Sequence, residues 1–171
     1  MALGMLDEAE TQFRIVEAFV RDPEPNGIMD LWRYAQHLFA SLGELSLLRR
    51  DSASALAYAD ECLEIAEPAQ HRKNIVKARR LRGRVLLTQG KLEGAERELE
   101  KALELATEVR NPPQLWESHL AMGELCAAQG RRDEGRACRI KAEEVLETVA
   151  ATVPDELGAR FRKNSKLKPE S

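Results

Sequence analysis

The chemistry open to this sequence depends on its charged side chains, and the basic ones gather in one stretch. No acidic residue occurs between Glu67 and Glu93, whereas eight positive charges do. These are Arg72, Lys73, Lys77, Arg79, Arg80, Arg82, Arg84 and Lys91. A solvated helix usually mixes charge signs, because opposite charges four residues apart stabilise each other. The stretch therefore indicates either ion pairs with neighbouring helices or a site for an anionic peptide or ligand.

Histidines would be the first candidates for acid–base catalysis. His37, His71 and His119 fall in different predicted helices, and none has an acid or base partner at a fixed local spacing. The sequence also contains no nucleophile motif and no phosphate-binding loop. We therefore expect the three histidines to pack on a surface or in a groove, and we expect neither an enzyme nor a cofactor.

Cysteines could bind a metal or form disulfides. Cys62, Cys126 and Cys138 are odd in number, fall within predicted helices, and form no CxxC motif or Cys/His cluster. This pattern is typical of buried, reduced thiols, which behave as small apolar residues. It predicts no zinc or other metal site.

Overall charge and hydropathy narrow the class of partner. The formal net charge is −3 and the isoelectric point is about 5.8, so the molecule as a whole has no field that attracts nucleic acid. No run approaches the roughly 20 apolar residues of a membrane span. The start of the chain resembles no signal peptide. We expect a cytoplasmic protein that binds neither nucleic acid nor membrane.

Residues 77–109 show which elements position the basic stretch. Apolar residues recur at helical spacing from Ala78 to Leu86, and a second apolar stripe runs from Leu92 to Ala106. Gly90 lies between the two stripes, where a C-terminal helix cap belongs. Gly83 lies inside the first stripe, although an interior glycine costs roughly 1 kcal/mol relative to alanine. The stretch is predicted to be two helices joined by a tight turn and in close backbone contact.

The pattern of this helix pair recurs along the chain at a constant interval. This interval equals the sequence separation between Gly43 and Gly83. The shift superposes an interior glycine of the first helix, a turn position, and two small residues of the second helix. The four sets are Gly43, Gly83 and Gly123; Arg50, Gly90 and Gly130; Ala55, Ala95 and Gly135; and Cys62, Ala102 and Ala142.

The spacing of Gly83, Gly90, Ala95 and Ala102 resembles the signature of the tetratricopeptide repeat. The sequence departs from that signature at its usual aromatic positions, and its period is stretched from the common value of roughly 34 residues to about 40 residues. Stretched repeats of this kind are similar to those in the C-terminal regions of large bacterial signalling ATPases, nucleotide cyclases and transcription regulators. A HEAT-type repeat has a similar period but lacks this glycine and alanine spacing.

The resemblance implies an all-α fold, a right-handed α-solenoid of antiparallel helix pairs with about three full repeats plus flanking helices. We expect one domain over 1–171, with helix pairs in 29–67, 70–109 and 113–150. Residues 5–20 are expected to be a second helix whose first helix is truncated. The remaining expectations are a C-terminal helix over 154–162 and a frayed tail over 163–171.

The resemblance further implies that the first helices line a groove that binds partners. The groove positions of the middle repeat are Lys77, Arg80 and Arg84; those of its neighbours are His37, Ala40 and Glu44, and Glu117, Leu120 and Glu124. The groove would be basic in the middle and acidic on both sides. Ala40 and Glu44 stand where co-chaperone members of the family carry a Lys and Asn pair, so a clamp for a C-terminal carboxylate is not expected.

These features predict a scaffold that binds a protein or peptide partner in its groove. An acidic protein or peptide is one such partner. Lys77, Arg80, Arg84, His37, Glu44, Glu117 and Glu124 are the predicted contact residues. The alternative is a sensor module for a small anionic effector. Trp32 and Trp116, near the starts of first helices, are expected to pack internally, with groove anchoring as the alternative. The truncated N-terminal helix could also pair two copies as a homodimer.

Overall fold

The computed structural model describes residues 3–22 and 28–164, except for the side chains of residues 3–5, 28–33, 160, 161, 163 and 164. Within these ranges the chain forms helices and no strand. They are α1 (Leu3–Arg21), α2 (Ile28–Leu48), α3 (Ser52–Ala66), α4 (Arg72–Thr88), α5 (Leu92–Val109), α6 (Pro112–Ala128), α7 (Arg132–Ala150) and α8 (Asp155–Asn164). The helices differ from the predicted bounds by only a few residues. Residues 163 and 164, which were expected to belong to the frayed tail, are part of α8. The rest of that tail, 165–171, and the side chain of Trp32 lie outside the described part.

The turns between paired helices are alike because the chain adopts the same conformation at the repeated turn position. Gly90 and Gly130 have φ angles of 71° and 79°, and Arg50 at the equivalent position has 64°. This left-handed region is one that glycine enters easily and that side chains with a Cβ disfavour. Asp51 then caps α3, since its carboxylate accepts a hydrogen bond of 3.0 Å from the Ser54 amide. Asn111 makes no such side-chain bond before α6, which starts directly with Pro112.

Close backbone contact within each pair explains the interior glycines. A Cβ added to Gly83 would lie 2.5 Å from Leu99 Cγ and 3.3 Å from the Ala95 carbonyl oxygen. A Cβ on Gly123 would lie 3.2 Å from the carbonyl oxygen of Gly135. Ala95 and Leu99 are fully buried. The helices approach so closely that only small residues fit where the backbones cross, as the sequence predicts.

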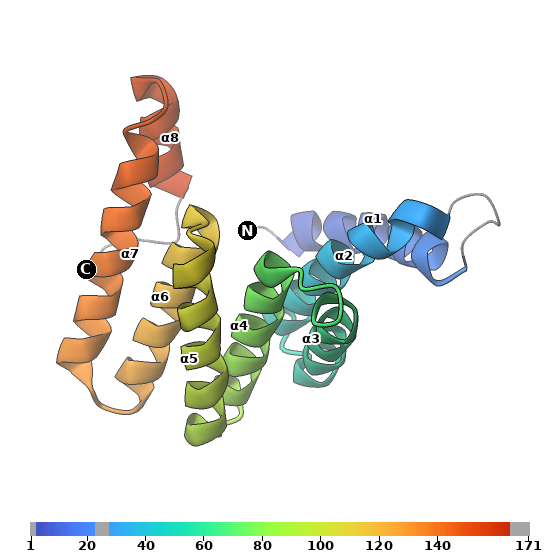
Figure 1. Cartoon of the computed structure of the whole chain (residues 1–171), viewed down its shortest axis with the longest axis horizontal. Coiled ribbons are helices and arrows are strands. Elements are labelled where there is room, and N and C mark those ends of the chain that lie inside the picture. The colour runs from blue at the N-terminus through green and yellow to red at the C-terminus, as the bar shows by residue number, and fades with distance from the viewer. Residues whose placement is uncertain (1–2, 23–27, 165–171) are drawn as a thin grey trace.

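The helices follow one another across the molecule in chain order, from α1 at one end to α8 at the other (Figure 1). The pairs α2–α3, α4–α5 and α6–α7 each pack together, and each second helix also contacts the next first helix. The first helices α2, α4 and α6 contact one another in turn. This arrangement is the all-α solenoid of the tetratricopeptide type that the sequence predicts.

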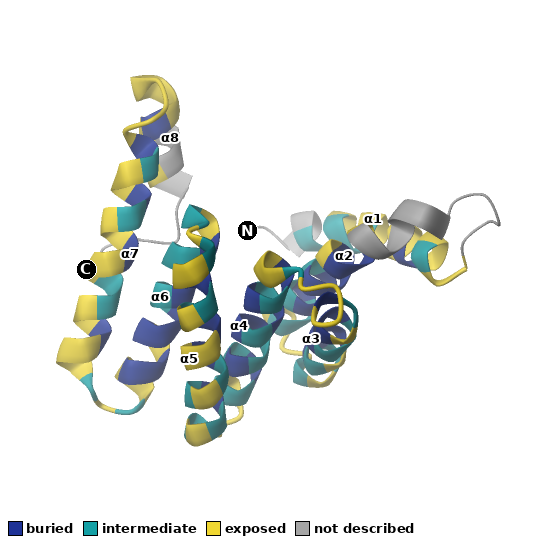
Figure 2. Cartoon of the chain, in the orientation of Figure 1, coloured by how far each residue is buried: buried dark blue, intermediate teal, exposed yellow. Residues whose placement is uncertain are grey.

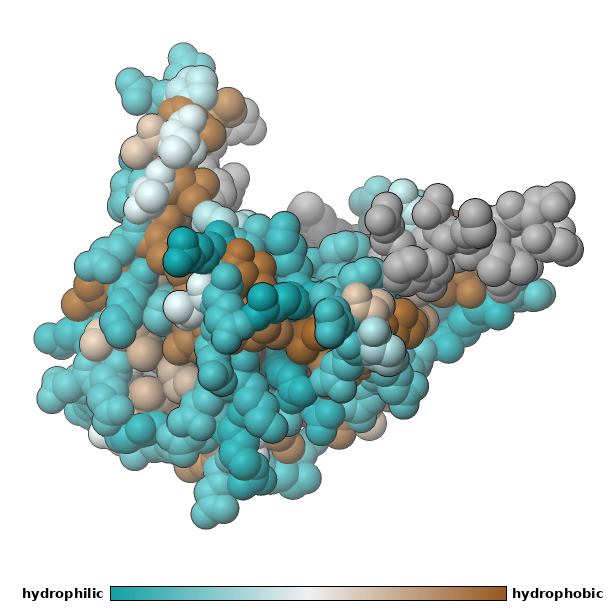
Figure 3. Space-filling view, viewed as in Figure 1, coloured by the Kyte–Doolittle hydropathy of each residue, from teal (hydrophilic) through white to brown (hydrophobic). Residues whose placement is uncertain are grey.

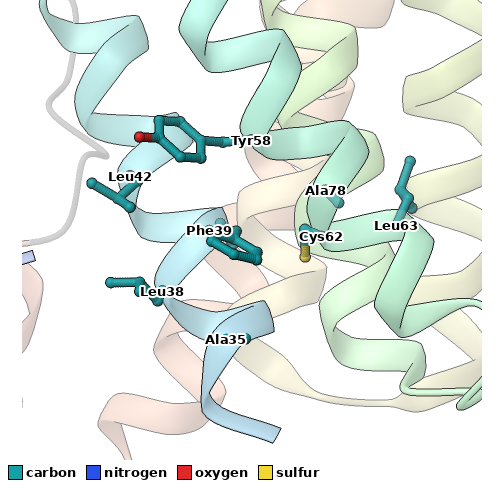
Figure 4. Packing of buried hydrophobic residues seen from close by; sticks show 9 residues of the cluster. Ala35, Leu38, Phe39, Leu42, Tyr58, Cys62, Leu63 and Ala78 are labelled. Atoms are coloured by element: carbon teal, nitrogen blue, oxygen red, sulfur yellow. The ribbon is translucent and has the colours of Figure 1, made fainter. Parts of the chain in front are cut away.

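The core runs along the array and has no single centre. Buried residues lie mainly where helices face each other, and exposed ones on their outer sides (Figure 2). One cluster joins α2, α3 and α4 and includes Phe39, Tyr58 and Cys62, whose side chains lie near one another in Figure 4. Cys62 and Cys126 are buried free thiols, and Cys138 is half-buried. Burial raises the pKa of Cys62 to about 11. The expected burial is thus confirmed for Cys62 and Cys126 but not for Cys138.

None of the helices in the described ranges is long and apolar enough to cross a membrane.

Candidate partner-binding surface

The predicted contact residues gather on α2, α4 and α6, the three first helices that contact one another. We call the surface formed by their partly or fully exposed side chains the first-helix face. Its charged or titratable members are His37, Glu44, Lys77, Arg84, Glu117 and Glu124. Residues from three repeats therefore meet on one surface, although a second helix and two turns separate each first helix from the next in the sequence.

Arg80 differs from these residues because its side chain lies beneath the surface. Only 5% of the residue is exposed. Its Nη1 donates a hydrogen bond of 3.0 Å to the Gln114 side-chain oxygen, and its Nη2 lies 3.8 Å from a Glu44 carboxylate oxygen. Burial lowers the pKa of Arg80, and the charges of Glu117 and Glu44 act in the opposite direction. Arg80 therefore supplies a buried positive charge that links α2, α4 and α6.

Arg84 and Lys77 lie on either side of Arg80 along α4, and each reaches a different first helix. Arg84 Nε lies 3.5 Å from a Glu124 carboxylate oxygen, so it forms an ion pair with a neighbouring helix, one of the two uses that the sequence indicates for the basic stretch. Lys77 Nζ lies 3.4 Å from His37 Nδ1. Burial and the nearby charges of Lys77 and His71 lower the pKa of His37. These effects favour the neutral ring of His37, whose Nδ1 can accept a hydrogen bond from the lysine.

Three further arginines of the basic stretch pair with acidic residues outside the first helices. Arg79 pairs with Glu67 at 2.6 Å and with Glu98 at 3.3 Å. Two further pairs complete the pattern: Arg82 with Asp60 at 3.1 Å, and Arg72 with Glu108. The positive charges of α4 thus spread around the helix and meet acidic residues from α2, α3, α5 and α6. They do not form one uninterrupted positive stripe.

A row of buried amides under the first-helix face was not singled out from the sequence. Asn74 donates a hydrogen bond of 2.9 Å to the Gln36 side-chain oxygen, and the Gln36 amide nitrogen lies 2.8 Å from His71 Nδ1. One repeat further along the chain, the Gln114 side-chain oxygen accepts a hydrogen bond from Arg80. Asn74 and Gln114 are separated by the same interval as Gly83 and Gly123. A search for polar residues that recur at the repeat period would therefore have found both.

The remaining aromatic and histidine expectations fall on or near these helices. Trp116 is half-buried on α6, which leaves both packing and anchoring open. His119 is also half-buried, and burial together with the charge of Lys141 lowers its pKa. In the described ranges no group of three His, Cys, Asp or Glu side chains could hold a metal ion.

An open hollow of about 600 Å³ lies elsewhere, at the turn between α4 and α5. It is lined by Arg82, Leu86, Gly90, Lys91, Leu92, Glu93, Gly94, Arg97 and Glu98. None of the predicted contact residues lines it. Its mixed charges single out no class of ligand.

Comparison with known proteins supports the repeat assignment. A model of the tetratricopeptide-repeat family matches residues 76–101 and 116–138. The first match runs from α4 into α5 and the second from α6 into α7, so each covers a crossing of paired helices. No curated protein and no solved structure matches the chain.

Proposed function

We propose that this chain, which carries tetratricopeptide repeats, is a scaffold whose first-helix face binds an extended partner segment with an acidic centre. Tetratricopeptide repeats generally mediate protein–protein interaction. The observation that carries the proposal is the pairing of partly exposed charges between two first helices, α4 and α6. The side chains of Arg84 and Glu124, which are 29% and 50% exposed, lie 3.5 Å apart although they belong to different repeats.

Such pairs can be exchanged for contacts with a partner at little cost. Exposed ion pairs contribute only about 0–1 kcal/mol, because water already solvates both charges. A partner carboxylate that displaced Glu124 from Arg84, or that reached Lys77, would gain a charge-assisted hydrogen bond. Basic residues flanking that carboxylate would meet Glu44, Glu117 or Glu124. The proposal thus predicts a pattern of charges in the partner: acidic in the middle and basic at the sides.

The test is a panel of synthetic peptides with acidic-centred, basic-centred and uncharged patterns, measured for binding to the purified chain. We expect acidic-centred peptides to bind, and Lys77→Glu with Arg84→Glu to abolish that binding. Arg97→Glu with Lys101→Glu is the matched control, because it makes the same change of charge at two exposed positions of α5, a second helix. Arg80 is left unchanged, since a substitution of this buried side chain would disturb folding.

Salt provides a second readout. Binding through exposed charges should weaken as the Debye length falls below about 8 Å. Equal binding of all patterns, or binding that neither the double variant nor salt alters, would place the interaction surface elsewhere.

A second candidate function is a sensor for a small anionic effector at the same face. The burial of Arg80 favours it, because a guanidinium shielded from water attracts an anion more strongly than an exposed one. We would measure the melting temperature of the chain with mono-, di- and tricarboxylates at low salt. A rise that one compound produces and that the Lys77→Glu, Arg84→Glu variant lacks would favour the sensor. No rise with any compound would leave the peptide scaffold as the proposed function.

A further inference from the structure

The first-helix face contains three charges that alternate in sign from helix to helix. Glu44 of α2, Arg84 of α4 and Glu124 of α6 are separated by the repeat interval, so they occupy the same position in successive first helices. Their side chains are 45%, 29% and 50% exposed. We call these three residues the charge row. We propose that the charge row recognises an extended partner segment that carries a basic, an acidic and a basic residue at every third position.

This inference rests on the proposed function, because it names the segment that the first-helix face binds. The other set of equivalent positions on that face is His37, Lys77 and Glu117. Burial and the charges of Lys77 and His71 lower the pKa of His37, which favours its neutral ring. Glu117 acts on the buried charge of Arg80. The charge row is therefore the part of the face where a partly exposed cation has a partly exposed acid on each side.

The spacing of the charge row fits one conformation of an extended chain. α2 contacts α4, and α4 contacts α6, and the axes of packed helices lie about 8–10 Å apart. In the polyproline II conformation three residues span about 9 Å and complete one turn, so every third side chain lies on the same side. In a β-strand the third side chain points to the opposite side. A polyproline II segment thus brings every third side chain to the next first helix.

The present contacts of the charge row can be exchanged for contacts with such a segment. Arg84 Nε lies 3.5 Å from a Glu124 oxygen, and a Glu44 oxygen lies 3.8 Å from Arg80 Nη2. Both distances exceed those of a good hydrogen bond. A partner carboxylate on Arg84 would release Glu124 for a partner lysine, so two charge-assisted contacts replace one exposed pair. A second partner lysine would meet the exposed side of Glu44.

The most exposed apolar side chains near the C-terminal end of the described part lie on other helices. Figure 3 shows a side of the molecule that is covered mostly by hydrophilic residues, with hydrophobic ones in a strip along α7 to α8. Ile140 of α7 and Leu157 of α8 are 48% and 53% exposed. A partner bound through apolar contacts at this strip would meet different helices from those of the charge row, so substitutions can separate the two modes of binding.

The test compares peptides of one length and composition that differ only in the spacing of their charges. A central glutamate has one lysine on each side, two, three, four or seven residues away, and all other residues are uncharged. We expect the three-residue spacing to bind the purified chain about fivefold more tightly than spacings of two or four, because these lose a flanking pair. Proline in the spacers should tighten binding further, since it favours the polyproline II conformation before binding.

Reversing one charge of the row should change which peptide binds best. Glu124→Lys should weaken binding of the lysine-flanked peptide and favour a peptide in which one flanking lysine is replaced by glutamate. Glu104→Lys is the matched control, because it makes the same change of charge at an exposed position of α5, a second helix. Glu44 is left unchanged, since it lies beside buried Arg80. Circular dichroism would check that both variants are folded.

The outcomes separate this inference from the proposed function. Equal affinity at spacings of two, three and four, or a Glu124→Lys variant that still prefers two flanking lysines, would overturn the inference although acidic-centred peptides still bind. Tightest binding at a spacing of seven would also overturn it, in favour of a helical partner, whose charges seven residues apart lie about 10.5 Å apart on one side. Binding of uncharged peptides that Leu157→Glu abolishes would move the partner to α7 and α8. No binding of any acidic-centred peptide would overturn both.

Discussion

The helices α1 and α5 each pack on the helix that follows them in the chain, α2 and α6, but different forces hold them in place. α5 meets α4 through Ala95, Leu99 and Ala102, which are all fully buried against a helix that carries Gly83 at the crossing. α1 meets its neighbours largely through charge. Glu17 of α1, only 7% exposed, accepts a hydrogen bond of 3.0 Å from Tyr58 of α3, and Arg14 and Arg21 of α1 itself also donate to it, at 2.7 and 3.0 Å.

Further polar contacts extend this network around α1. Arg21 pairs with Glu61 at 3.0 Å and lies 5.2 Å from the centre of the Phe39 ring. Phe13 is only partly buried against the core of α2 and α3. Close packing thus joins the inner repeats, whereas α1 is attached by a network of hydrogen bonds and ion pairs that depends on ionisation. We therefore expect α1 to detach in local openings that leave the inner repeats folded.

The largest expected effect comes from Leu99→Ala, which removes a fully buried side chain at the α4–α5 crossing. We expect the free energy of unfolding to fall by about 2–5 kcal/mol, because a cavity adds to the lost burial. Phe13→Ala changes a residue with which α1 meets the core, and it should cost less, since Phe13 keeps part of its surface in water. Chemical denaturation would measure both. If Phe13→Ala lowers the free energy of unfolding more than Leu99→Ala does, α1 is held by apolar packing as α5 is, and the contrast between them is wrong.

Ala95→Leu tests the close approach from the opposite direction. The added atoms have no space beside Gly83, so overpacking should cost roughly 1–3 kcal/mol of stability. Glu100→Leu is the control, because it introduces the same side chain at an exposed position of α5. A melting temperature that Ala95→Leu does not lower would contradict the repeat register.

Glu17→Gln should loosen α1 by about 1–3 kcal/mol, because two arginines and a tyrosine lose their charged acceptor. The effect depends on pH. Burial acts to raise the pKa of Glu17, but hydrogen bonds from Arg14, Arg21 and Tyr58 outweigh it and hold the pKa below its ordinary value of 4.5. The folded state therefore binds this proton less readily than the unfolded state. The stabilisation is fully present above that value and is lost as pH falls through the lowered pKa.

Hydrogen exchange of the α1 amides would measure this effect. Corrected for the intrinsic exchange rate, protection of α1 in the wild type should decline as the solution is made acidic, while α5 remains protected. Glu17→Gln should remove most of that dependence. Protection of α1 that is independent of pH in both proteins would rule out a role for the Glu17 carboxylate in attaching the helix.

The smallest expected effect belongs to Arg49→Ala. Arg49 pairs with Asp7 and Glu10 across α1 and α2, and both arginine and Asp7 are well exposed. Such pairs contribute about 0–1 kcal/mol and are screened by salt. We expect a small loss of α1 protection at low salt and none at high salt, with global stability unchanged. A loss that persists at high salt would indicate that Arg49 acts through packing.

Much of the fold was predictable because its signals are local and periodic. The apolar stripes of residues 77–109 mark two helices, and the glycine at Gly90 marks the turn between them. The recurrence of small residues at the repeat period marks where paired helices cross, since only small side chains allow such close contact. Arg50 has the same left-handed backbone as Gly90 and Gly130. Its position in the repeat, rather than its residue type, was the informative signal.

Repeat spacing indicated which side chains of α2, α4 and α6 lie near one another, but not how deeply each one is buried. Repeat spacing placed Lys77, Arg80 and Arg84 on a surface shared with Glu44 and Glu124. It did not distinguish buried Arg80 from partly exposed Arg84, because both have the same residue type in the same helix. Burial depends on the neighbouring first helices, whose residues lie a whole repeat away in the sequence.

The sequence by itself determined the helices, their pairing and the register of the repeat, because these follow from local periodicity and from side-chain size. Only the tertiary structure decided how the charges are used. The basic residues of α4 pair with acids from four different helices, and Glu17 becomes a buried acceptor that attaches α1. The reason is that a charge is stabilised by whatever lies within a few ångströms of it, and in this array those neighbours come from other helices and other repeats.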